Sequence, residues 1–94
     1  MSERTGPALA KLDTFLPLVT ALPASPARTQ LVDEAEALKR AVAAFHMEAI
    51  RFRMYAVDRM IASAGDPADV RRVFDELRHA LEDAGFHTRS HASP

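Results

Sequence analysis

One acidic side chain and a histidine have the types and spacing of metal ligands. Glu76 and His79 form a Glu-x-x-His segment, and residues three apart lie on the same face of a helix. Di-iron four-helix proteins use this spacing because both side chains can then ligate one metal ion. These residues define a candidate metal site whose cofactor would be iron.

The region around this segment, about residues 46–84, resembles the encapsulated-ferritin branch of the ferritin-like family. In that branch a two-helix protomer supplies one Glu from its first helix and a Glu-x-x-His from its second, and a dimer completes the iron site. The resemblance implies that Glu48, Glu76 and His79 are the ligands. Helical spacing, however, places Glu76 and His79 opposite the apolar stripe of their own helix, whereas a di-iron site faces the bundle interior. A ferritin-like metal protein is therefore an alternative function.

Three basic side chains, Lys39, His46 and Arg53, recur every seven residues, between two apolar stripes. Partly buried polar groups need partners. One interpretation is a ligand or anion pocket at a dimer interface, in which His46 would respond to pH. The interpretation that we favour is structural, with these groups bonding to acidic side chains across an interface and setting its register.

Arginines also flank a tyrosine on the expected polar side of the same segment. Arg51, Tyr55 and Arg59 follow one another at intervals of four, and Arg53 lies close by. Such a group is typical of a small phosphate or nucleic-acid patch, so a nucleic-acid-associated regulator is a further alternative. Twelve basic and thirteen acidic residues give a net charge of −1. This balance disfavours nucleic acid as a partner and favours a solvated helix face.

Composition excludes several classes of chemistry. The chain has no cysteine, which excludes thiolate metal sites and cysteine nucleophiles, and its three separated glycines form no phosphate-binding loop. Its serines lie at ends, caps and turns, so we expect a non-enzymatic protein without a cofactor. The apolar segment Leu12–Leu22 is too short to cross a bilayer, which predicts a cytoplasmic location and no membrane partner. The excess of arginine over lysine is typical of a GC-rich bacterial genome.

Helices must position all of these side chains. Alanine is the commonest residue and β-branched residues are few, which predicts an all-α fold in one domain over residues 1–94. Gly65 and Pro67 predict a tight turn between two antiparallel helices, whereas no glycine or proline interrupts the chain from Ala27 to Ala64. We therefore expect a flexible segment at 1–6, a short helix at 7–22 kinked at Pro17, a very long helix at 26–64, a medium helix at 67–84 and a flexible tail at 87–94.

The expected long helix carries two apolar stripes on different faces. The first consists of Leu31, Ala35, Leu38, Val42, Phe45, Ala49, Phe52 and Ala56. The second includes Met47, Ile50, Met54, Val57 and Ile61. The helix at 67–84 has one apolar face and can cover one stripe, so we expect the second stripe to be an interface that joins two hairpins in a four-helix-bundle-like core. The alternative is that the long helix breaks near residues 40–46 and the chain folds back as a monomeric bundle.

These patterns favour a function based on binding over a function based on catalysis. We expect a small homodimeric helical protein that acts through protein–protein interaction, as an adaptor, an assembly factor or a regulator. Its expected partners are a second copy of itself and another protein, because an uncovered apolar stripe marks an interface.

Overall fold

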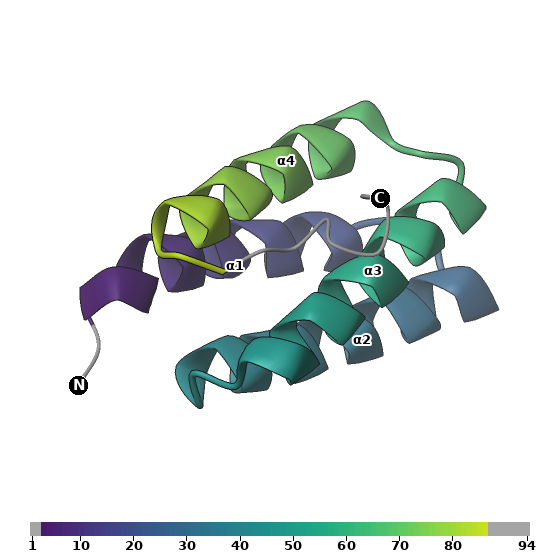
Figure 1. The fold of residues 1–94 in the computed structure, drawn as a ribbon. Coiled ribbons are helices and arrows are strands. Elements are labelled where there is room, and N and C mark those ends of the chain that lie inside the picture. The colour runs from purple at the N-terminus through teal and green to yellow at the C-terminus, as the bar shows by residue number, and fades with distance from the viewer. Residues whose placement is uncertain (1–2, 87–94) are drawn as a thin grey trace, which may run out of the picture.

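The computed structural model describes residues 3–86, and within this range every regular element is helical (Figure 1). The all-α prediction is confirmed. The predicted flexible tail at 87–94 lies outside the described residues, whereas residues 3–5, expected to be flexible, form a short 3₁₀ turn. The elements are η1 (Glu3–Thr5), α1 (Gly6–Thr20), α2 (Pro26–Ala43), α3 (Met47–Ser63) and α4 (Ala68–Asp83).

The helix α1 is the centre of the packing. It packs against both α2 and α4, and α2 packs in turn against α3, whereas α3 and α4 share only a small contact (Figure 1). Pro17 lies inside α1 without dividing it. The rings of Phe15 and Phe74 join α1 to α4 at 6.1 Å between centroids. Every helix contributes to one core, which includes Leu12, Val19, Leu31, Leu38, Val42, Ile50, Met54, Ile61, Leu77 and Leu81.

The very long helix expected over 26–64 is two helices in the structure. The helix α2 ends at Ala43 and α3 begins at Met47. The amide of Phe45 donates to the carbonyl of Val42, and the amide of His46 donates to the carbonyl of Ala41. This pair of bonds is the Schellman pattern that closes a helix, and it normally has glycine in the left-handed position. Phe45 occupies that position here, with φ 61°.

Burial of apolar surface explains this break. In one straight helix the stripe around Leu38 and the stripe around Met54 would point in different directions, and one chain could not cover both. The turn at residues 44–46 redirects α3, so that both stripes enter the same core. A left-handed non-glycine residue costs about 1–2 kcal/mol. Each large apolar side chain that becomes fully buried contributes about 1.5–3 kcal/mol, so the folded-back arrangement is favoured.

The ends of α3 and α4 follow the glycine signals in the sequence. Gly65 and Gly85 have φ values of 93° and 99° and close α3 and α4 with the same hydrogen-bond pattern. A Cβ at Gly85 would lie 2.8 Å from the Arg4 side chain. Arg4 donates to the carbonyl of Ala84 at 2.7 Å and thereby ties the start of the chain to the end of α4. None of the described helices is long and apolar enough to span a membrane.

Candidate functional site

The side chains expected at a dimer interface lie mainly in the core of the single chain. Ile50, Met54, Val57 and Ile61 are at most 1% exposed, because the turn at 44–46 directs them toward the other helices. Met47 precedes them at the start of α3 and is 41% exposed. The prediction of an uncovered strip was therefore wrong for four of the five residues. The prediction failed because it assumed one continuous helix over residues 26–64.

The three basic residues expected to share a pocket lie in different places. Lys39 pairs with Asp13 at 2.9 Å and joins α2 to α1. The Nδ1 atom of His46 accepts a hydrogen bond from the amide of Ala49 at 3.2 Å, which caps the start of α3. Arg53 donates to both carboxylate oxygens of Glu34. Each residue therefore has a structural partner, and the three form no common ligand pocket.

The pair of Arg53 and Glu34 connects α3 to α2. The Nη1 atom of Arg53 lies 2.9 Å and 3.1 Å from the two carboxylate oxygens. Arg53 and Lys39 thus have acidic partners, as the favoured interpretation expects, whereas His46 bonds to a backbone amide. The contacts lie within one chain and not across a dimer interface, and they set the register of α2 against its neighbours.

The candidate iron ligands do not form a metal site. Glu76 is bound to Lys11 at 2.9 Å, and His79 lies on the exposed side of α4, away from the core. Glu48 lies on another helix, at the first turn of α3. Within residues 3–86 no group of three or more carboxylate or histidine side chains is placed to hold a metal ion. The structure therefore gives the ferritin-like alternative no support.

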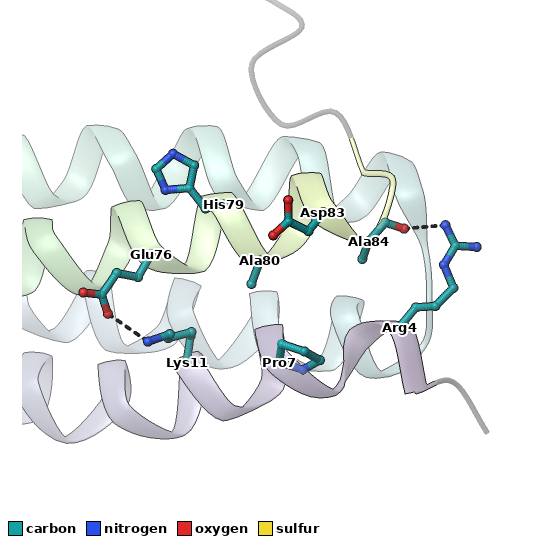
Figure 2. Close-up of a pocket in the computed structure, with 8 residues that line it drawn as sticks. All are labelled: Arg4, Pro7, Lys11, Glu76, His79, Ala80, Asp83 and Ala84. Carbon is teal, nitrogen blue, oxygen red and sulfur yellow. Dashed lines mark hydrogen bonds and ion pairs between the residues drawn. The ribbon is translucent and has the colours of Figure 1, made fainter.

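A shallow groove of about 460 Å³ lies between α1 and α4 (Figure 2). Its walls contain small apolar residues, and its rim carries charges of both signs. The hydrogen bond from Lys11 lowers the pKa of Glu76, and the nearby charges of Lys11 and Arg72 act in the same direction. Glu76 thereby joins α4 to α1 as the ion-pair partner of Lys11. The lining residues are Arg4, Pro7, Lys11, Glu76, His79, Ala80, Asp83 and Ala84.

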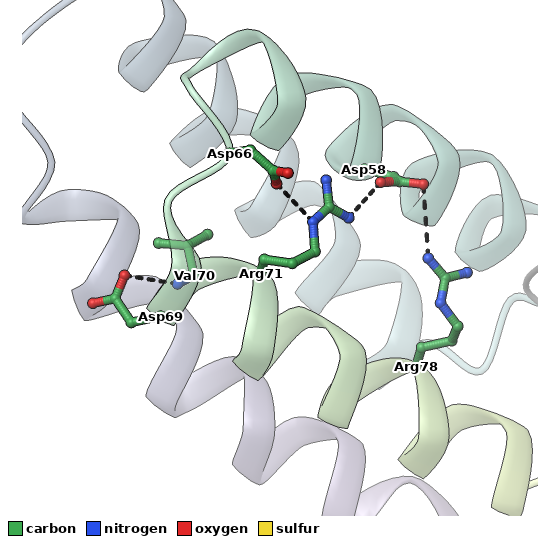
Figure 3. A network of polar contacts seen from close by, with 6 residues as sticks. All are labelled: Asp58, Asp66, Asp69, Val70, Arg71 and Arg78. Atoms are coloured by element: carbon green, nitrogen blue, oxygen red, sulfur yellow. Dashed lines mark hydrogen bonds and ion pairs between the residues drawn. The ribbon is translucent and has the colours of Figure 1, made fainter.

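A polar network holds the turn between α3 and α4 (Figure 3). Arg71 donates to Asp66 at 2.8 Å and to Asp58 at 2.6 Å, and Arg78 lies 3.7 Å from Asp58. Partial burial lowers the pKa of Arg71, but the hydrogen bonds to Asp58 and Asp66 outweigh this effect and raise the pKa above its ordinary value. Both arginines also lie over the ring of Phe74. The network is a structural clamp in which every charge faces an opposite charge.

A surface of large apolar side chains remains exposed on and before α3. Phe45, Met47, Phe52 and Tyr55 form this α3 aromatic surface, with exposed fractions of 47%, 41%, 61% and 38%. Phe52 is more than half exposed although apolar side chains of this size usually enter a core. Large apolar side chains that stay exposed along one helix are candidates for contact with a partner. The surface is therefore the candidate functional site.

Arginines border the α3 aromatic surface. The guanidinium of Arg53 lies 5.4 Å from the centroid of the Phe52 ring, and that of Arg59 lies 5.7 Å from the centroid of Tyr55. Arg59 also donates to the Tyr55 hydroxyl at 2.9 Å. Arg59 thus pairs with Tyr55, four residues before it in α3. Arg53 and Arg59 are two of the three arginines of the hypothetical nucleic-acid patch. Both therefore contact other side chains of the same chain.

Sequence reasoning missed this surface because it assigned Phe45 and Phe52 to a continuous core stripe. The break at residues 44–46 leaves Leu31 to Val42 of that stripe buried and turns Phe52 outward. The available signal was the change of apolar face between Val42 and Ile50. A stripe that moves to another face of one helix indicates a bend, even where glycine and proline are absent.

Comparisons with known protein families, with curated proteins and with solved structures find no match to this chain.

Proposed function

We propose that this chain is a non-enzymatic helical domain that acts by binding another protein through the α3 aromatic surface. The observation that carries the proposal is the exposure of Phe52 beside Tyr55, on a helix whose opposite face is buried in the core. Aromatic side chains and arginine are the residues most enriched at the centres of protein interfaces. This surface offers both.

The geometry favours a helix as the partner. Residues three apart on a helix are neighbours, so Phe52 and Tyr55 form a continuous apolar patch along α3. Such a patch fits the apolar stripe of an amphipathic helix. The exposed arginines Arg51 and Arg59 border it, so carboxylates beside the partner's stripe would complement its charge.

A pair of synthetic helical peptides tests the proposal. Both carry leucine in a heptad stripe, and one has glutamate and the other lysine at the flanking positions. We expect the glutamate peptide to shift the NMR signals of residues 48–59 more strongly than the lysine peptide does. Phe52→Asp should remove these shifts, whereas Thr14→Asp, which places the same charge on the exposed side of α1, should retain them.

Two results would contradict the proposal. One is the absence of shifts in α3 with either peptide. The other is an equal loss of binding in Phe52→Asp and Thr14→Asp, which would show that the added charge and not the surface matters. Circular dichroism of both variants verifies that each keeps its helices.

A further inference from the structure

Four exposed residues of α3 follow a heptad seam. Glu48, Phe52, Tyr55 and Arg59 are separated by four, three and four positions, which is the spacing that keeps side chains on one line along a helix. All four lie on the exposed side of α3, whereas Ile50, Met54, Val57 and Ile61 of the same helix are buried. This helix therefore has a second seam, directed away from its own core.

The order of side chains along this seam is self-complementary. It runs acidic, aromatic, aromatic, basic from the start of α3 to its end. When two copies of α3 lie antiparallel about a twofold axis between positions 53 and 54, Glu48 of each copy faces Arg59 of the other. The same axis places Phe52 of each copy against Tyr55 of the other. A twofold interface requires this kind of self-matching, since one patch must serve both subunits.

We propose that the partner of the α3 aromatic surface is a second copy of this chain. The two copies dock antiparallel through Glu48, Phe52, Tyr55 and Arg59. This inference rests on the proposed function. The homodimer expected from the sequence is retained, but its interface is the outward seam of α3 and not the buried stripe of Ile50 to Ile61.

Charge supports a second copy as the occupant. Within residues 3–86 the carboxylate of Glu48 has no hydrogen bond or ion pair, so it can receive an arginine from another subunit. Arg59 keeps donors for Glu48 of the second copy while it bonds to the Tyr55 hydroxyl, because a guanidinium has five N–H groups.

Size indicates that the dimer is weak. A helix of 17 residues is about 25 Å long, and a pair of such helices buries an area at the low end of specific interfaces. The dimer should therefore form and dissociate with concentration. Stacking of two Phe52–Tyr55 pairs provides the apolar centre, and the Glu48–Arg59 pairs at both ends set the direction.

Variants that exchange the charges of Glu48 and Arg59 test the inference. Sedimentation equilibrium at low salt measures their dimerisation. Glu48→Arg and Arg59→Glu each place like charges at both ends of the seam and should weaken the dimer about tenfold. The double variant Glu48→Arg/Arg59→Glu restores opposite charges and should dimerise as the natural chain does. Glu36→Arg and Arg40→Glu make the same charge changes on the exposed face of α2 and should leave the dimer unchanged.

The sedimentation and peptide-binding experiments together distinguish a failure of the antiparallel dimer from a failure of the proposed function. A chain that stays monomeric at every concentration but binds the glutamate peptide would overturn the second copy as partner and leave the proposed function intact. A dimer that both single charge variants leave unchanged, or that the double variant fails to restore, would overturn the antiparallel seam. Absence of both self-association and peptide binding would overturn both proposals.

Discussion

Phe45 closes α2 with a backbone conformation that phenylalanine rarely adopts. Its φ of 61° lies in the left-handed region, where a Cβ is crowded by the following carbonyl. Its ring meets that of Phe86 edge-on at 5.1 Å between centroids, so the corner between α2 and α3 contacts the turn that closes α4. The side chain thereby offsets part of the strain of its backbone.

Substitution at this position distinguishes a turn from a continuous helix. In Phe45→Gly the backbone strain is relieved, whereas Phe45→Ala keeps the strain, and both variants lose the ring contact. We expect Phe45→Gly to be about 1 kcal/mol more stable than Phe45→Ala in urea unfolding. A straight helix through residue 45 would give the opposite order by a similar amount, since glycine destabilises a helix interior relative to alanine.

The pair of Lys11 and Glu76 predicts a pH dependence. The pKa of Glu76 is lowered below its ordinary value of 4.5, chiefly by the hydrogen bond from Lys11. A carboxylate with a lowered pKa in the folded state stabilises it at neutral pH, and this stabilisation is lost as pH falls below about 4.5. The natural chain should therefore be more stable than Glu76→Gln at pH 7, with a difference that shrinks in acid.

Urea unfolding at a series of pH values measures this difference. Asp75→Asn is the matched control, because it removes one negative charge from the exposed side of the same helix. A difference between the natural chain and Glu76→Gln that stays constant from pH 7 to acid would contradict the assigned role of the ion pair.

The four helices end for different physical reasons. At Gly65 and Gly85 the residue type itself permits the left-handed turn, and the sequence predicts both ends within one or two residues. The end of α2 has no glycine, since the residues that follow it are Ala44, Phe45 and His46. Capping by His46 and burial on both sides of the turn decide the break there. Local propensity predicts a continuous helix through this segment.

The clamp at Arg71 stabilises the turn from α3 to α4. Arg71→Ala removes two hydrogen bonds and leaves Asp58 and Asp66 without this partner, so we expect a loss of about 1 kcal/mol in the free energy of unfolding. Arg72→Ala is the control, since Arg72 is far more exposed and its pair with Glu76 is longer, at 3.5 Å. An equal effect of the two substitutions would show that the clamp contributes nothing to stability.

At the scale of the whole molecule, a single chain already builds a closed core. The Cα radius of gyration is 12.3 Å, and a compact domain of this length has a value of about 12 Å. The α3 aromatic surface lies outside this core, so we expect stability and the proposed self-association to depend on different faces of α3. That separation makes the two properties independently testable.

Paired substitutions on α3 test the separation. Ile50→Ala creates a cavity in the core and should lower the free energy of unfolding by about 2–5 kcal/mol. Phe52→Ala should change it by about 0.5 kcal/mol or less while weakening self-association. Urea unfolding at low protein concentration and sedimentation at high concentration measure the two effects. If Ile50→Ala instead weakened the dimer and left the free energy of unfolding unchanged, the stripe of Ile50 to Ile61 would be the interface.

The sequence by itself determined the helical class, the two glycine-marked helix ends, the stripe of α4 and the exposed position of His79. These features depend on residue type and helical spacing, which are local. Only the tertiary structure decided that the chain turns at Phe45, which side of α3 enters the core and which partners Lys39 and Arg53 find. The physical reason is that burial summed over all four helices outweighs the local preference of residues 44–46 for a continuous helix.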